Sequence, residues 1–221
     1  MDLKLKICGM KNPENIKKIA ALAPDYLGFI FYEKSPRYVK DEILLQEEKI
    51  KKVGVFVDAS EAYILKKLEK YGLSAVQLHG NESPEFCRGL KKAILERNLK
   101  AELIKVFSVG EDFDFELLKV YEKEVDFFLF DTKGRNRGGN GISFNWEILK
   151  KYNSATPFFL SGGIGPESLQ QIKDLYTFFR ENGKENLFYA LDVNSRFEVS
   201  PGLKNVEQLS TFKRQLLEQK N

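Results

Sequence analysis

The stretch Leu3-Lys4-Leu5-Lys6-Ile7-Cys8-Gly9 opens the chain with an alternating apolar run that ends in a thiol followed at once by glycine. Such a run is typical of a β-strand. A second apolar run, Phe127-Phe128-Leu129-Phe130, ends in the same way in the carboxyl group of Asp131. If the two strands are parallel, Cys8 and Asp131 reach the same rim of one sheet. Their chemistry is that of a general base and a general acid.

Short apolar segments alternate with charged helical stretches along the whole chain. Most of the apolar segments are too continuously hydrophobic for a half-exposed sheet, which indicates buried parallel strands. The predicted strands cover residues 3–7, 26–31, 52–57, 75–78, 102–107, 127–130, 158–160 and 187–190. The predicted helices cover residues 13–23, 41–48, 61–71, 84–98, 115–123, 146–152, 166–180 and 206–219.

Local signals mark several ends of these helices. Asn12-Pro13 and Ser83-Pro84 each offer an N-cap followed by proline at the first helical position. Ser60 precedes another helix in the same role. Gly72 and Gly183 follow helical runs, where a left-handed residue is expected.

The count of eight strand–helix units predicts an α/β fold with one domain over residues 1–221, a (β/α)8 or TIM barrel. The structural rival is an open, doubly wound sheet. That fold commonly carries a glycine-rich dinucleotide loop after its first strand. Here Cys8-Gly9-Met10 stands at that position, which favours the closed barrel.

Composition excludes several classes of function. The chain has 221 residues, of which 43% are hydrophobic, and its net charge of +3 gives no concentrated basic face, so we expect no nucleic-acid partner. Two cysteines and one histidine leave no metal-ligand spacing and no disulfide framework, so we expect no metal and a reduced, cytoplasmic location. The start, Met1-Asp2-Leu3-Lys4, is no signal peptide, and no apolar run is long enough to span a membrane.

Further candidate residues follow the other predicted strands. Arg37 can clamp a carboxylate in bidentate fashion, although a surface salt bridge is the simpler interpretation. For His79, a ligand contact and an ordinary histidine of the rim are equally good interpretations. Asp58 is a rim carboxylate or, with Ser60, part of a helix N-cap. Cys87 falls inside a predicted helix and is interpreted as a packing residue.

Glycine-rich loops at the predicted rim suggest a phosphate site. Glycine lets backbone N–H groups converge on a phosphate without a side chain in the way. Gly162 and Gly163 follow the seventh predicted strand, where barrels of this class commonly bind phosphate. Gly139 lies in a long basic loop after the sixth strand, and 192–195 follows the eighth. Tight turns alone are the alternative explanation for these glycines.

Several motifs, in this order along the chain, resemble the phosphoribosylanthranilate isomerase family. The resemblance extends from end to end, and several of the blocks are specific. The motifs are Lys6-Ile7-Cys8-Gly9-Met10, Ser35-Pro36-Arg37, Val53-Gly54-Val55-Phe56-Val57, Val76-Gln77-Leu78-His79-Gly80, Phe130-Asp131-Thr132, Gly138-Gly139-Asn140-Gly141, Phe144-Asn145-Trp146, Leu160-Ser161-Gly162-Gly163-Ile164 and Asp192-Val193-Asn194-Ser195, the last followed by Pro201-Gly202.

The resemblance implies an isomerase of tryptophan biosynthesis. The implied reaction is the Amadori rearrangement of N-(5'-phosphoribosyl)anthranilate to 1-(2-carboxyphenylamino)-1-deoxyribulose 5-phosphate, with no metal or organic cofactor. Cys8 matches the general base and Asp131 the general acid. The implied substrate contacts are Arg37 (to the anthranilate carboxylate), His79 and Asp192. The implied phosphate contacts are Gly139, Gly162, Gly163, Asn194 and Ser195. The expected partner is this small molecule, and the expected assembly is a monomer or homodimer.

The residue chemistry agrees with that reaction. A carboxylic acid such as Asp131 can protonate the ring oxygen of the sugar, and a thiolate at Cys8 can remove the proton from C2. The thiol then needs a positive potential nearby to ionise. The sequence alone identifies no single cation for that role.

Two departures from the family pattern affect the expected phosphate site. The family usually reads Asp-Val-Ser-Ser-Gly after strand eight, whereas this chain has Asn194 and, in place of glycine, Arg196. We expect Arg196 to impose a different turn or to add a phosphate contact. Asn140 stands where the family's other glycine loop has threonine.

Three competing interpretations remain at this level. Indole-glycerol-phosphate synthase uses lysine and glutamate groups, and the histidine-pathway isomerase uses two aspartates in a half-barrel repeat. The chain shows no internal repeat, and its first strand ends in Cys8 instead of aspartate. The third is an inactive barrel that serves as a binding module, against which the presence of both Cys8 and Asp131 argues.

Overall fold

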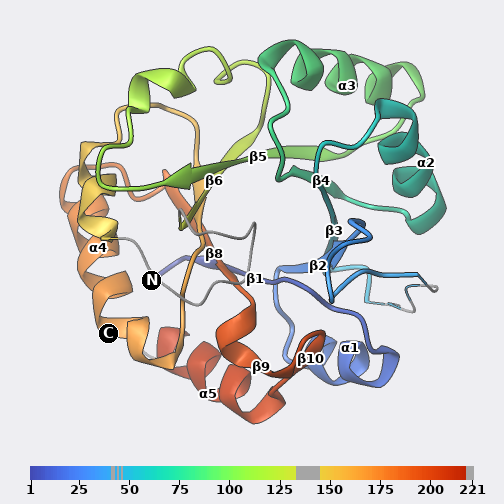
Figure 1. Ribbon diagram of the computed structural model, residues 1–221. Coiled ribbons are helices and arrows are strands. Elements are labelled where there is room, and N and C mark those ends of the chain that lie inside the picture. Colours follow the sequence, from blue (N-terminus) through green and yellow to red (C-terminus); the bar gives the residue numbers. More distant parts are fainter. Residues whose placement is uncertain (41–42, 44, 46, 133–144, 218–221) are drawn as a thin grey trace.

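Eight parallel strands close into a barrel in sequence order, β1 to β8, in the computed structural model. The structure describes residues 1–40, 43, 45, 47–132 and 145–217. Helices surround the strands on the outside (Figure 1). The (β/α)8 prediction is thereby confirmed. The strands are β1 Lys4–Ile7, β2 Tyr26–Ile30, β3 Lys51–Phe56, β4 Ala75–Leu78, β5 Glu102–Val109, β6 Phe127–Thr132, β7 Phe158–Leu160 and β8 Phe188–Val193.

Both faces of the barrel strands are buried, which explains their continuous apolar sequences. A smaller hydrophobic cluster, with Val53, Ile104 and Phe159 among its members, consists only of strand residues and fills the inside. A larger cluster joins the outward strand residues to the helices. Leu5 and Ile7 belong to the larger cluster. Because side chains alternate along a strand, Lys6 between them points into the barrel.

In the described part of the chain, five α-helices pack on the outside, and their ends follow the signals in the sequence. Asn12, Ser60 and Ser83 each accept a hydrogen bond from the backbone N–H three residues later, as expected for N-caps. Gly72 adopts the left-handed conformation at φ 57°, and Gly183 does so at φ 65°. The helices are α1 Pro13–Ala20, α2 Glu61–Tyr71, α3 Pro84–Glu96, α4 Leu169–Glu181 and α5 Val206–Leu217. Among the described residues, no helix is both long and apolar enough to cross a membrane.

Two predicted α-helices are wrong. The segments 115–123 and 146–152 form only the short 3-10 helices η1 Phe115–Leu118 and η2 Trp146–Lys151. These runs are too short to favour an α-helix, and 3-10 helices commonly occur as short pieces. Of the predicted helix 41–48, residues 41, 42, 44 and 46 lie outside the described part, and residues 43, 45 and 47 are not helical.

The last strand is longer than predicted, and a small hairpin follows it. Because β8 extends to Val193, Asp192 lies within the strand and not in the loop after it. Asp131 likewise lies inside β6. After β8 come η4 Ser195–Phe197 and an antiparallel pair, β9 Glu198–Ser200 and β10 Leu203–Lys204, which the sequence analysis did not predict.

Candidate active site

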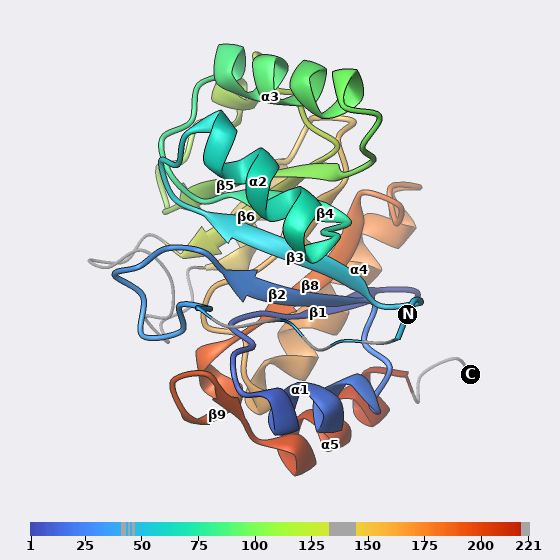
Figure 2. The same ribbon diagram turned by 90° about the vertical axis from the view of Figure 1, so that its right-hand side faces the viewer.

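The carboxyl ends of the strands form one rim of the barrel, and the candidate residues gather there. The parallel strands end on the same side of the molecule, as the side view shows (Figure 2). Cys8 follows β1 directly, and its backbone N–H donates to the carbonyl oxygen of Val193 at 2.9 Å. Cys8 is therefore held against the end of β8. In (β/α)8 barrels this rim is where chemistry takes place.

The thiol of Cys8 lies in a tight, buried position. Cys8 is only 4% exposed. A Cβ on Gly28 of β2 would stand 2.8 Å from the Cys8 sulfur, so the absence of a side chain there makes room for the thiol. Burial raises the pKa of the thiol, Lys6 and Lys204 oppose that effect, and Asp192 adds to it. The net direction is upward, so without substrate the thiol is held in its neutral form.

Lys6 supplies the positive charge beside the thiol. It precedes Cys8 by two residues and therefore shares its inward face. Its ammonium lies 2.9 Å from Oδ1 of Asp192, and its positive charge acts to lower the pKa of the Cys8 thiol. Burial lowers the pKa of Lys6, but Asp192 and Cys8 more than offset it, so its net pKa is raised. Lys6 is thus a fully buried, charged ammonium.

Asp192 is the counter-ion of that lysine and faces a second carboxylate. Its pKa is raised by burial, lowered by Lys6, and raised again by Asp131. Asp131 and Asp192 come two residues after Leu129 and Ala190, which belong to the inner cluster, so the two carboxylates face the same interior space. The structure therefore brings Cys8, Asp131 and Asp192 to one mouth of the barrel.

His79 is a side-chain partner of Asp131. Its Nε2 lies 3.5 Å from Oδ2 of Asp131, and its Nδ1 lies 3.1 Å from the side-chain amide of Gln77. Gln77 lies on β4, two residues before His79 and on the same inward face. The amide fixes the ring so that Nε2 is directed at the carboxyl group.

A buried ion pair fixes the loop that carries His79. Glu82 and Lys105 lie 3.1 Å apart with side chains only 3% exposed. Glu82 also accepts the backbone N–H groups of Gly80 and Asp58. Asp58 was a candidate helix cap with Ser60. In the structure Ser60 is the N-cap of α2. The side chain of Asp58 accepts the backbone N–H of Asn81 at 2.6 Å.

Arg37 lies beside Cys8 and is already paired. An added Cβ on Gly9, whose φ is 77°, would stand 2.7 Å from Cδ of Arg37, so the arginine stem packs over the residue after Cys8. Its guanidinium donates to Glu198 of β9, with Nη2 at 2.6 Å from Oε2. Arg37 is thus neither a surface salt bridge nor an isolated clamp.

Only part of the expected phosphate site lies within the described residues. Gly162 and Gly163, after β7, have φ values of 85° and 71°, which strongly favour glycine. Ser195 opens η4 after β8. The side-chain oxygen of Asn194 accepts from Lys204 at 2.7 Å. Gly139 lies outside the described residues.

Arg196 connects the loops after β7 and β8. It forms an ion pair with Glu167, which lies in η3 Pro166–Ser168 just beyond Gly162 and Gly163. The residue after it, Phe197, completes the 3-10 turn η4 and is buried. Arg196, which stands where the family pattern has glycine, therefore lies in a 3-10 turn. Its ion pair with Glu167 joins this turn to the loop after β7.

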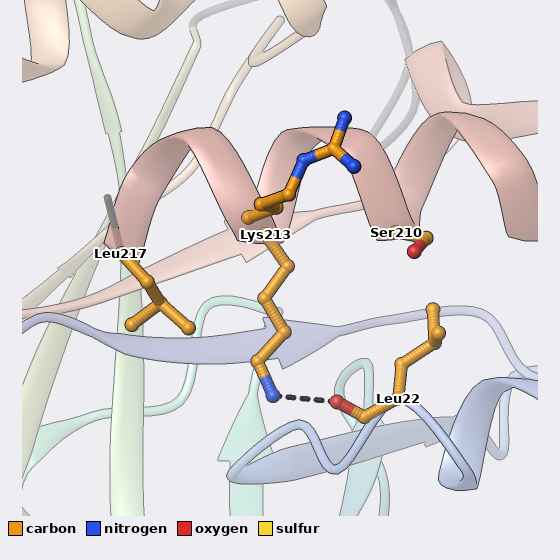
Figure 3. Close-up of a pocket in the computed structure, with 5 residues that line it drawn as sticks. Leu22, Ser210, Lys213 and Leu217 are labelled. Atoms are coloured by element: carbon orange, nitrogen blue, oxygen red, sulfur yellow. Dashed lines mark hydrogen bonds between the residues drawn. The ribbon is translucent and has the colours of Figure 1, made fainter.

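A pocket of about 420 Å³ lies elsewhere, on the outer surface. Lys213 on α5 donates to the carbonyl oxygen of Leu22, which follows α1 (Figure 3). Leu22 lies in the connection that leads into the start of β2, at the edge of the barrel opposite the rim with Cys8. The pocket is therefore separate from the candidate site. Its lining is Leu22, Ser210, Lys213, Arg214 and Leu217.

Comparison with known proteins agrees with this geometry. A family model described as N-(5'phosphoribosyl)anthranilate (PRA) isomerase matches residues 5–215. The chain belongs to this family. A relative of the same name from Parabacteroides distasonis is 43% identical over 219 residues, which cover 96% of this chain and 93% of the relative. Another from Phocaeicola vulgatus is 41% identical, with 96% and 97% covered.

The phosphoribosylanthranilate isomerase fold is also found among solved structures. The enzyme from Thermus thermophilus superimposes with a TM-score of 0.81 at 26% identity, covering 98% of this chain and 99% of the other. A crystal structure of a phosphoribosylanthranilate isomerase in complex with reduced 1-(o-carboxyphenylamino)-1-deoxyribulose 5-phosphate gives a TM-score of 0.74 at 27% identity, covering 97% of this chain and 98% of the other.

Sequence reasoning missed three residues of the candidate site. Lys6 could have been found, because a lysine two residues before Cys8 in a buried strand must share the inward face of the thiol. Glu198 and Lys204 gave no comparable signal. They reach the site only through the β9–β10 hairpin, whose formation the local pattern did not indicate.

Proposed function

We propose that this protein is an N-(5'-phosphoribosyl)anthranilate isomerase of tryptophan biosynthesis, in which Cys8 is the general base and Asp131 the general acid. The observation that supports it best is that Cys8, directly after β1, and Asp131, near the end of β6, lie at the same rim of the closed parallel barrel, in a chain of this family. The reaction is an Amadori rearrangement, an aldose-to-ketose isomerisation that uses no external cofactor.

Ring opening is the first step. Asp131 donates a proton to the furanose ring oxygen, the bond from C1 to that oxygen breaks, and its electron pair stays on oxygen. The lone pair of the anthranilate nitrogen forms the C1=N bond of a protonated Schiff base. His79, 3.5 Å from Asp131, is placed to stabilise the carboxylate that remains. Positioned proton transfer of this kind is worth roughly 10²–10⁴-fold in rate.

Deprotonation at C2 is the second step. The Schiff base draws electrons from C1, which acidifies the proton on C2, and the Cys8 thiolate removes it. The C–H electrons form the C1=C2 bond of an enolamine and neutralise the nitrogen. The enolamine then gains a proton at C1 and loses one from the C2 hydroxyl to give the ketose. Since burial disfavours the thiolate, the Lys6 ammonium is the group that stabilises it.

The other rim residues bind the substrate. Arg37 binds the anthranilate carboxylate, and the backbone N–H groups around Gly162 and Gly163 bind the phosphate together with Ser195, Asn194 and the Gly139 loop. Asp192, which is held by its ion pair with Lys6, contacts the sugar of the substrate. The monomer-or-homodimer prediction and the cytoplasmic location have no test among the described residues.

The direct test is turnover. Freshly made phosphoribosylanthranilate is fluorescent, and its decay should accelerate on adding the purified protein in the presence of EDTA. Asp131→Asn is the matched inactive control, because an amide cannot donate a proton to the ring oxygen at a useful rate. A wild-type rate equal to the uncatalysed rate would refute the proposed function.

A further inference from the structure

The guanidinium of Arg37 is held on one edge only. Its Nε lies 3.0 Å from both carboxylate oxygens of Glu198, and its Nη2 lies 2.6 Å from Oε2. Among the contacts of the described residues, none uses Nη1. A guanidinium has five N–H donors in a planar fork, so the edge formed by Nη1 and Nη2 is left for a second carboxylate.

Glu198 cannot easily leave this position. Its side chain is 4% exposed, whereas the next residue on β9, Val199, is 69% exposed. Besides Arg37, its carboxylate accepts from Nζ of Lys204 at 2.7 Å and from the backbone N–H of Gly202 at 3.1 Å. Burial alone would raise the pKa of Glu198, but the bonds from Arg37 and Lys204 lower it overall. Glu198 is therefore a fixed anion and not a mobile group that blocks Arg37 until substrate arrives.

Lys204 balances the charge of Glu198. Its side chain is fully buried, and its ammonium also donates to the side-chain oxygen of Asn194 at 2.7 Å. The positive charge on its far side offsets the negative charge that Glu198 would otherwise present to the site. Arg37 is thus oriented without having its own charge cancelled.

We infer that Glu198 and Lys204 form a positioning pair that presents the free edge of Arg37 to the carboxylate of the substrate. This inference rests on the proposed function, because it takes the ligand of Arg37 to be the anthranilate carboxylate. Arginine otherwise loses considerable side-chain freedom when it binds a ligand, and a pre-oriented guanidinium avoids that loss. The β9–β10 hairpin thereby determines selectivity for a carboxylate-bearing substrate.

The test compares two probes by direct binding and does not depend on turnover. One is reduced 1-(o-carboxyphenylamino)-1-deoxyribulose 5-phosphate, and the other is the same compound with phenyl in place of carboxyphenyl. Glu198→Gln keeps the shape of the side chain and removes its charge. It should reduce the preference for the carboxylated probe by about tenfold, the equivalent of the rotamer freedom restored to an arginine. Affinity for the phenyl probe should hardly change.

Three further variants make the result specific. Lys204→Met should also reduce the preference, because Glu198 would then neutralise Arg37. In an Arg37→Ala background, Glu198→Gln should cause no further loss of preference. Val199→Ala, on the exposed side of the same strand, should retain the wild-type preference.

The possible failures are distinguishable. If wild type prefers the carboxylated probe and Glu198→Gln keeps that preference, the positioning pair is refuted while Arg37 remains the clamp. If Glu198→Gln weakens both probes equally, Glu198 supports folding only, and the inference is likewise refuted. If wild type shows no preference at all, the assignment of Arg37 in the proposed function fails, and the inference fails with it.

Discussion

Lys6 and Asp192 form a buried ion pair inside the barrel, with Nζ 2.9 Å from Oδ1 and side chains 0% and 5% exposed. The pair joins the first and last strands of the barrel at register partners, since Lys6 lies opposite Asp192 in the β1–β8 ladder. This ion pair thus links the two strands that close the barrel, and it holds the Lys6 cation on the inward face that the thiol of Cys8 shares.

Breaking this pair on one side should be costly. Lys6→Met leaves the Asp192 carboxylate buried without its cation, and we expect a loss of about 3–5 kcal/mol in the free energy of unfolding, measured with urea. The double variant Lys6→Met/Asp192→Asn should recover most of that loss and still leave Cys8 less reactive. A single variant as stable as wild type would show that the pair has no such role.

The raised pKa of Cys8 predicts its alkylation profile. In a Cys87→Ala background, the rate of modification by iodoacetamide should keep rising with pH and reach half its maximum above the ordinary thiol value of 9.0. Bound product analogue should slow the reaction. Cys8→Ser should nearly abolish turnover, because a hydroxyl is far less acidic than a thiol. A midpoint below 9.0 would mean that Lys6 outweighs burial.

Gly162 and Gly163 should tolerate no β-branched side chain. Valine at either position adopts a positive φ only at a strain of about 1–3 kcal/mol, and its Cβ would enter the space proposed for phosphate. We expect inhibition by inorganic phosphate to weaken in variants that still fold. Gly89→Ala is the control, because a Cβ there meets nothing closer than 3.7 Å in the middle of α3, and alanine should stabilise the helix. Unchanged phosphate inhibition in the valine variants would contradict the assignment.

Lys204 should make stability depend on alkaline pH. Burial lowers its pKa from 10.5 to about 8, so between these values the unfolded chain binds a proton that the folded chain does not. The stability of wild type relative to Lys204→Met should therefore rise with pH across this window, by at most about 1.4 kcal/mol per pH unit. Urea unfolding of both proteins at several pH values measures the difference. A flat or falling difference would mean that Lys204 keeps its ordinary pKa.

The sequence alone was sufficient to predict the barrel and the shared rim of Cys8 and Asp131. Apolar runs such as 127–130 and caps such as Ser83 are local signals, and local hydrogen bonding and burial decide whether a strand or helix forms. Once the strands are parallel, their ends must share one rim, so Cys8 and Asp131 were placed without knowledge of any contact. The short segments around Phe115 and Trp146 were misassigned, because periodicity in so few residues does not distinguish an α-helix from a 3-10 helix.

Only the tertiary structure decided which charges meet at that rim. Arg37 and Glu198 are 161 residues apart in the chain, and nothing near either one specifies the other. Their pairing follows from the closure of the barrel and from the β9–β10 hairpin, which bring buried charges to within hydrogen-bond distance. A buried charged group must find a partner or become neutral by gaining or losing a proton, and which partner it finds is fixed by the packing of distant strands. For that reason the positions of Cys8 and Asp131 at the rim could be predicted, whereas the pairs Lys6–Asp192 and Glu198–Lys204 could not.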